Sequence, residues 1–173
     1  VPPAVVRETA RQLMRDERFD HVVALIHAAL RHGQSQPWMY EGLGLAMEAA
    51  GHSRADIERA LMSAIDYGAT SIDLLYLAQY LDRLELSARA LKLCQQAAQM
   101  EPTRAEAYVQ GLRIAQRLDD LAGIRWATIG VLSQAWPKEH ISLWQQAYDV
   151  AAATLERLRS DGRKHEADDY ERA

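Results

Sequence analysis

The histidines, acidic pairs and single cysteine are the residues that could do metal or acid–base chemistry, and their spacing argues against it. The six histidines lack the His-x-x-x-His spacing beside a carboxylate that a zinc site on one helix needs. Asp119-Asp120 and Asp168-Asp169 fall in or near predicted hairpin turns, where aspartate is favoured as a cap. Cys94 lies on a predicted helix stripe as a small apolar core residue. We therefore expect no metal site, no cofactor and no catalytic residue.

Other chemistries are excluded by what the sequence lacks. It contains no glycine-rich phosphate loop, no Gly-x-Ser-x-Gly motif and no strand to carry one, which argues against nucleotide binding and serine hydrolysis. With 20 basic and 24 acidic residues, the net charge of -4 argues against nucleic acid or anionic membrane as a partner. No run approaches the roughly 20 apolar residues of a membrane span. The lone cysteine rules out an internal disulfide and leaves the localisation open.

The remaining class of function is recognition of a partner by charged and aromatic side chains. Arg113 and Arg117 are one helical turn apart and form a basic pair that could hold a carboxylate. Trp38 and Trp144 are expected to pack between helices because an indole buries a large apolar area. Trp126 and Trp136 lie off the apolar stripes, and packing on a neighbouring hairpin is favoured for them over a role as partner anchors.

The elements that must position these residues are short amphipathic helices. In the central stretch, Leu74, Leu77, Ala78 and Leu81 form one stripe, and Ala90, Leu93, Cys94 and Ala97 form a second. Two short helices cannot bury both stripes alone, so the pair requires similar neighbours. We expect Ala78 and Ala97 to sit at close helix contacts without room for a larger side chain. The predicted hairpins span residues 3–33, 35–68, 71–101, 103–136 and 138–173, within a single domain over residues 1–173.

Residues that favour helix starts and helix ends lie at the boundaries of these predicted helices. Proline suits a helix start, serine or threonine followed by an acidic residue three positions later forms a capping box, and glycine favours a helix end. The predicted signals are Pro2 and Pro3, the boxes Ser53–Asp56 and Thr103–Glu106, the N-cap Ser71, and the stops Gly33, Gly51 and Tyr67-Gly68.

The bulky residue in the first turn of each leading helix recurs at a regular interval. Trp38, Leu74, Tyr108 and Trp144 are separated by 36, 34 and 36 residues. A period of about 34 residues is typical of one class of helical repeat.

At these positions the chain resembles the tetratricopeptide repeat family. In the central unit, the positions of that family's pattern are occupied in order by Leu74, Leu77-Ala78, Leu81, Ala90, Ala97 and Pro102. In the units on either side, pattern positions are occupied by Trp38, Gly42 and Pro137. The resemblance implies an all-α fold: a right-handed α-solenoid of antiparallel hairpins, about four and a half repeats, whose leading helices line a concave binding face. Leu112 and Tyr148 stand where that family has a small residue, so other helical solenoids remain an alternative. The chain has no asparagine, so the family's Lys and Asn carboxylate clamp is not carried over.

The same register predicts which side chains face the groove. They lie on the leading helices one turn away from the packing stripe, and the alternative is an ordinary solvated helix face. The candidates change from apolar to mixed to basic along the chain. They are Met39, Leu43, Gln79, Asp82, Arg83, Arg113, Gln116, Arg117, Gln145 and Asp149.

These observations predict a non-catalytic scaffold that binds a protein or peptide. An acidic segment would be held by Arg113 and Arg117 while its apolar residues reach Met39 and Leu43. The alternative is that Arg117 pairs with Asp120 in its own turn and does not bind a ligand. Two alternatives are an accessory repeat domain that docks a catalytic domain of the same chain, and an RNA-binding helical repeat, which the single basic pair disfavours. The chain begins at Val1 without methionine and ends inside a predicted helix, so we expect it to be part of a longer protein.

Overall fold

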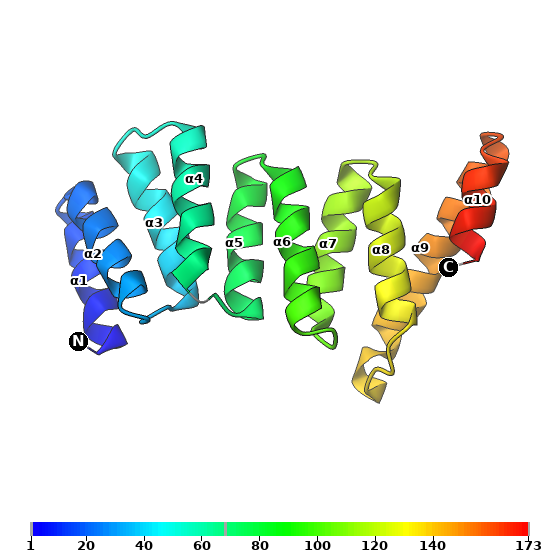
Figure 1. The fold of residues 1–173 in the computed structure, drawn as a ribbon, viewed down its shortest axis with the longest axis horizontal. Helices are drawn as coiled ribbons and strands as arrows, with labels where there is room; N and C mark the ends of the chain where they lie inside the picture. Colours follow the sequence, from blue (N-terminus) through cyan, green and yellow to red (C-terminus); the bar gives the residue numbers. More distant parts are fainter. Residues whose placement is uncertain (1, 68, 173) are drawn as a thin grey trace. The chain divides into compact units, whose positions relative to one another are not determined.

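The computed structural model describes residues 2–67 and 69–172, and the regular structure of these residues is entirely helical (Figure 1). This confirms the all-α prediction, and neighbouring helices pack in pairs. The α-helices are α1 (Pro3–Arg15), α2 (Phe19–Arg31), α3 (Pro37–Ala49), α4 (Arg54–Ala64), α5 (Ser71–Arg83), α6 (Ser87–Met100), α7 (Ala105–Arg117), α8 (Leu121–Leu132), α9 (Ile141–Ser160) and α10 (Lys164–Glu171), with single 3-10 turns η1 (Ile65–Tyr67) and η2 (Lys138–His140).

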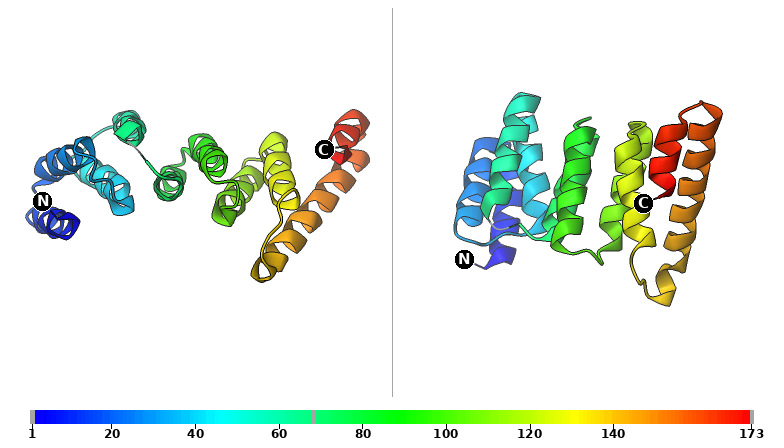
Figure 2. Two further views of the ribbon diagram at one scale, coloured as in Figure 1. Left: turned by 60° about the horizontal axis from the view of Figure 1, so that its bottom comes forward. Right: turned by 45° about the vertical axis from the view of Figure 1, so that its right-hand side comes forward.

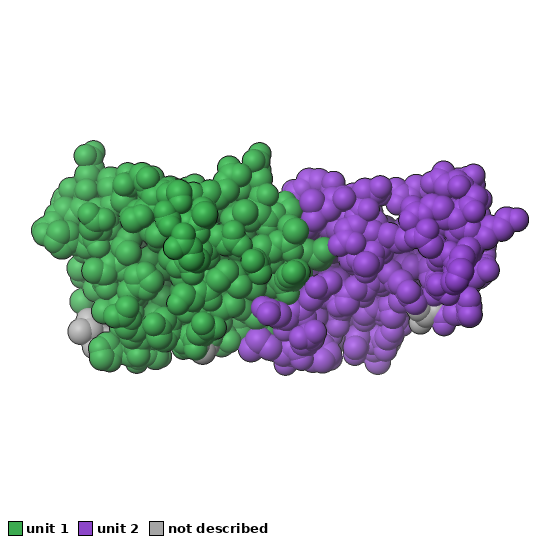
Figure 3. Space-filling model, turned by 45° about the horizontal axis from the view of Figure 1, so that its top comes forward, with its two compact units in different colours: residues 1–93 green, residues 94–173 purple. Residues whose placement is uncertain are grey.

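The chain groups into two compact units, residues 1–93 and residues 94–173 (Figure 3). The division between the units falls within α6, and the single domain over residues 1–173 stays a prediction. A division inside a helix is natural in an array of hairpins, because each element of such an array contacts mainly its sequence neighbours.

The four leading helices α1, α3, α5 and α7 start at equal intervals along the chain, at Pro3, Pro37, Ser71 and Ala105. This interval is called the repeat period below. The turns recur with the same period, since Glu17, Gly51, Glu85 and Asp119 all have left-handed backbone, with φ of 56°, 81°, 62° and 51°. In each turn the next residue donates its N–H to a carbonyl five residues back, which is the bond that closes a helix after a left-handed residue. The backbone itself is therefore periodic.

The repeat period corrects the register predicted for α3. One period before Leu74 stands Tyr40 and one period after it stands Tyr108, and all three side chains are buried. The prediction aligned Trp38 with Leu74, which is two residues off, because Trp38 is equivalent to the exposed Ile72. The expectation for Trp144 was also wrong. In the first turn of α9 the buried residue is Leu143, and Trp144 is 41% exposed.

Two of the predicted caps are shifted or absent. Ser53 caps α4 as expected, accepting from the Asp56 N–H at 3.2 Å. The N-cap of α5 is Thr70, one residue before the predicted Ser71, and Thr70 forms a reciprocal capping box with Asp73. The predicted cap at Thr103 was wrong, because α7 begins at Ala105 and puts Arg104 at the cap position.

Arg104 instead forms a two-pronged ion pair with Glu101. Of the predicted stops, Gly33 and Gly51 have the left-handed backbone expected of them. Gly68 lies outside the described residues.

In unit 1, Tyr80 of α5 joins α5 to α3. Its ring lies against Gly44 of α3, and its hydroxyl donates to Glu48 at 2.9 Å. Arg83 lies 5.0 Å above the ring and pairs with Glu41 at 3.0 Å. Burial, and then the bond to Glu48, raise the pKa of Tyr80. The hydroxyl therefore stays a neutral donor at physiological pH.

In unit 2, Tyr108 of α7 is the centre of an aromatic cluster. Its ring lies against Gly130 of α8 and 5.4 Å from the ring of Trp126, which itself covers Gly111. Trp136 meets Tyr108 edge to face at 6.1 Å, and its indole N–H donates to the Val131 carbonyl. Both tryptophans therefore pack within their own unit, in keeping with the packing role predicted for them. Cys94 is buried, as predicted.

His27 on α2 is expected to make stability depend on pH. Burial, and then the neighbouring Arg31, lower its pKa below the ordinary value of 6.5. As pH falls below 6.5 the unfolded chain takes up a proton before the folded chain does, so stability is lost until the folded pKa is reached. Urea unfolding at neutral and mildly acidic pH should show this loss, and His27→Gln should reduce it. An identical pH dependence in the two proteins would contradict the assignment.

Candidate partner-binding grooves

A groove of about 350 Å³ lies in unit 1 between α1 and α3, with α2 beneath it. Apolar side chains of all three helices form its floor and walls. They are Ala10 and Met14 of α1, Val22 and Ile26 of α2, and Trp38 and Leu45 of α3. Leu45 is 39% exposed although it is a large apolar side chain. The groove therefore presents apolar area to solvent that a ligand could cover.

The α1 side of this groove carries a row of three arginines. Arg7, Arg11 and Arg15 line it at successive helical turns. The Arg7 guanidinium lies 6.0 Å above the Trp38 ring. Arg11 and Arg15 share one carboxylate, that of Glu8, at 3.8 Å and 3.3 Å. The row keeps an excess of positive charge, since a single carboxylate is divided between two guanidinium groups.

The opposite side of the groove is held by the network around Tyr80. Glu41 lines the groove on α3, and Arg83 of α5 pairs with it at 3.0 Å. The negative charge of Glu41 is thereby balanced within the protein. The potential along the groove is set by the arginines of α1.

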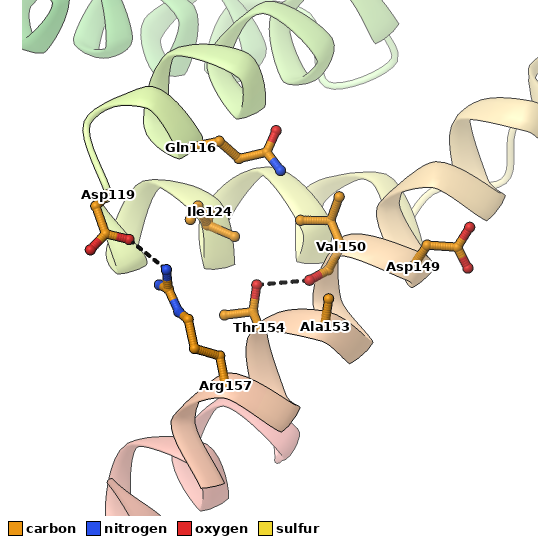
Figure 4. A pocket seen from close by; sticks show the side chains of 8 residues that line it. All are labelled: Gln116, Asp119, Ile124, Asp149, Val150, Ala153, Thr154 and Arg157. Carbon is orange, nitrogen blue, oxygen red and sulfur yellow. Dashed lines mark hydrogen bonds and ion pairs between the residues drawn. The ribbon is translucent and has the colours of Figure 1, made fainter. Parts of the chain in front are cut away.

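Unit 2 has a more polar groove of about 400 Å³ among α7, α8 and α9 (Figure 4). Ile124, Val150 and Ala153 form its apolar part, and Gln116 and Asp149 lie at its edges. Arg157 crosses it to pair with Asp119 at 2.8 Å, as the dashed line in Figure 4 shows. This groove offers carboxylates and an already paired guanidinium, so its lining mixes charges of both signs.

The structure corrects two of the predicted groove residues. Met39 and Leu43 are fully buried and cannot touch a partner in this conformation. The cause is the shifted register, because Leu43 is equivalent to the core residue Leu77 and is not a groove position. The α3 residue equivalent to the predicted Gln79 and Arg113 is Leu45, which does line the unit 1 groove.

The other predicted residues lie at several places. Gln79, Arg113, Gln116, Arg117, Gln145 and Asp149 are exposed and Asp82 is half-buried. Gln116 and Asp149 are brought together in the unit 2 groove, where Gln145 donates to Asp149 at 3.1 Å. Arg83 acts on the unit 1 groove through Glu41. Asp120, the predicted competitor for Arg117, accepts from the Gly123 N–H as the cap of α8.

Sequence reasoning missed the residues that define the unit 1 groove. Arg7, Arg11 and Arg15 recur every four residues, which puts them on one side of a helix and is a signal visible in the sequence. The predicted groove begins at α3 and follows a register displaced at Trp38, so it does not include this row on α1. With the repeat period applied, Arg11 is the α1 equivalent of Leu45.

No protein-family model, curated protein or solved structure matches the chain. Among the described residues, no three histidine, cysteine, aspartate or glutamate side chains gather as a metal site would require. Within the same ranges, none of the helices combines the length and the apolar character needed to cross a bilayer.

Proposed function

We propose that the chain is a non-catalytic binding module whose unit 1 groove holds an acidic, amphipathic segment of a protein or peptide. One observation carries this proposal: an apolar floor with the exposed Leu45 runs beside the row of Arg7, Arg11 and Arg15. Apolar residues of the ligand would cover Trp38 and Leu45. Its carboxylates would meet the arginines, whose planar donors suit carboxylate geometry.

The two parts of the groove contribute differently to binding. Covering Leu45 and the edge of Trp38 supplies most of the affinity, because burial of apolar area is the main favourable term in association. The exposed arginines are screened by salt and act mainly on the association rate and on the choice of an acidic ligand. The proposed binding is therefore sensitive to ionic strength.

The proposal includes a tetratricopeptide-like, right-handed solenoid as the scaffold. The equal spacing of the four leading helices and of their left-handed turns supports it. The spacing agrees with the length of that repeat, which is about 34 residues. In such a scaffold the leading helices line the concave face, and α1 and α3 are both leading helices.

The test uses a fluorescent peptide that alternates leucine and phenylalanine with glutamate, and measures its anisotropy against the full chain. We expect saturable binding that weakens as salt is added. The triple substitution Arg7→Glu, Arg11→Glu and Arg15→Glu should weaken it on the order of tenfold to a hundredfold, because attraction becomes repulsion at three positions. Leu45→Ser should weaken binding without changing its salt dependence.

Two arginine controls locate the site. Arg54→Glu with Arg59→Glu changes exposed charges on α4 and should leave binding intact. Arg113→Glu with Arg117→Glu tests the basic pair of α7. Loss of binding in that variant, with retention in the triple variant, would move the ligand to α7. Equal binding of a lysine version of the peptide, or displacement by a single-stranded oligonucleotide, would overturn the proposal.

A further inference from the structure

Two arginines of the unit 1 groove point to a single carboxylate that the protein itself supplies. Arg11 and Arg15 of α1 reach different oxygens of Glu8, at 3.8 Å and 3.3 Å. Both distances exceed the roughly 2.7 to 2.9 Å of a close pair between a guanidinium and a carboxylate. All three side chains are more than half exposed. Glu8 therefore takes the place of an anion without satisfying either guanidinium group well.

The rest of the arginine row leaves its positive charge uncompensated. Arg7 lies over the Trp38 ring, and within the part of the chain that the structure describes it forms no ion pair. Gln12 accepts from Arg15 at 2.7 Å, but this amide carries no charge. Three guanidinium groups that share one carboxylate keep an excess of two positive charges.

A carboxylate and a phosphate on a ligand would compensate this charge differently. A carboxylate that displaces Glu8 replaces one single negative charge by another, so little is gained. A phosphate on serine or threonine carries about 1.5 to 2 negative charges at pH 7 and has three acceptor oxygens. It matches the excess charge and can accept from both guanidinium groups at once. Displacement of Glu8 costs little, because an exposed ion pair contributes little to stability.

We infer that the ligand of the unit 1 groove is a segment phosphorylated on serine or threonine, whose phosphate is bound by Arg11 and Arg15 in place of Glu8. This inference rests on the proposed function, since it assigns the chemistry of the ligand in the same groove. The left view of Figure 2 shows α1 and α3 on the same side of α2, so the groove opens between these two leading helices. Apolar residues next to the phosphorylated one would cover Trp38 and Leu45. Phosphorylation of the segment would then strengthen its binding.

Three versions of the fluorescent peptide test this inference. They keep the leucine, phenylalanine and glutamate residues of the peptide described above and differ at one central position, which is serine, glutamate or phosphoserine. In anisotropy titrations against the full chain, the phosphoserine peptide should bind on the order of tenfold tighter than the glutamate peptide. The glutamate and serine peptides should differ by no more than about threefold, because one carboxylate only takes the place of Glu8.

Substitutions on α1 assign the preference to these residues. Arg11→Gln with Arg15→Gln should remove the preference for phosphoserine, while the serine peptide still binds through the apolar floor. Glu8→Gln removes the internal competitor, so the glutamate peptide should then bind several-fold tighter than the serine peptide. The matched control is Arg113→Gln with Arg117→Gln, an arginine pair of the same spacing on α7, which should keep the preference.

Equal binding of the phosphoserine and glutamate peptides would overturn the inference and leave the proposed function standing, since all three peptides would still bind. If none of the three binds, the proposed function itself fails. A preference that persists in the double variant of α1, or that is lost in the α7 control, would place the phosphate elsewhere and overturn the inference. Tighter binding to vesicles containing phosphoinositide than to the phosphoserine peptide would assign the arginines to a lipid headgroup and overturn it as well.

Discussion

Gly44→Ala is expected to lower the free energy of unfolding by about 1 to 3 kcal/mol, although alanine normally favours a helix over glycine. A Cβ at this position would lie 2.2 Å from Cε1 of the Tyr80 ring, and the Tyr80 hydroxyl oxygen would be only 2.5 Å away. The ring would have to move, and moving it would break its hydrogen bond to Glu48. The steric cost therefore exceeds the gain of about 1 kcal/mol in helix propensity.

Gly42→Ala on the same helix is the matched control. Its new Cβ would meet the flexible tip of Ile26 at 3.3 Å, which can shift by a few tenths of an ångström. Here the helix propensity should dominate, and stability should stay equal or rise. Urea unfolding followed by circular dichroism compares the two variants. If Gly44→Ala is as stable as Gly42→Ala, the packing of Tyr80 on α3 is not as described.

Ala78→Leu is expected to cost a similar amount, about 1 to 3 kcal/mol, by overpacking. Ala78 is fully buried, and by the repeat period it is equivalent to Ala10 and Gly44. Within unit 1, the small residue Gly44 lets α3 and α5 approach closely. A leucine at the fully buried Ala78 must displace the side chains around it or adopt a strained rotamer.

Ala88→Leu serves as the control for size alone, since Ala88 is exposed on α6. Its effect should lie within about 0.5 kcal/mol, as is usual for surface substitutions. The thermal midpoint of each variant measures the difference. An unchanged midpoint for Ala78→Leu would show that the position has room, and the assigned equivalence with Gly44 would then be wrong.

The helices were predictable because their signals are local. Apolar stripes with the helical period and prolines at Pro3 and Pro37 are properties of a few adjacent residues, and the left-handed glycine at Gly51 followed from residue type alone. The corresponding turns at Glu17, Glu85 and Asp119 carry no glycine, so their shared geometry was invisible. That shared geometry is what defines the register of the repeats.

The groove could be predicted only in part, because it depends on that register. An error of two residues at Trp38 moved Leu43 to the surface and put Leu45 on the packing stripe and not in the groove, although both are leucines on one helix. Trp144 was misplaced for a related reason. In the sequence it looks like a core tryptophan, but the first turn of α9 buries Leu143 and leaves Trp144 exposed.

The equal spacing of leading helices also bears on how such a chain changes by duplication or loss of gene segments. If residues 37–70 were deleted, α5 would follow α2 directly, and the remaining leading helices and left-handed turns would keep the repeat period. The backbone would accept the deletion, but Ala10 would then take the place of Gly44 opposite Tyr80. Its methyl group fills the space that the ring occupies. Side-chain contacts such as that between Gly44 and Tyr80 therefore restrict which repeat can follow which. The backbone geometry alone would allow other orders.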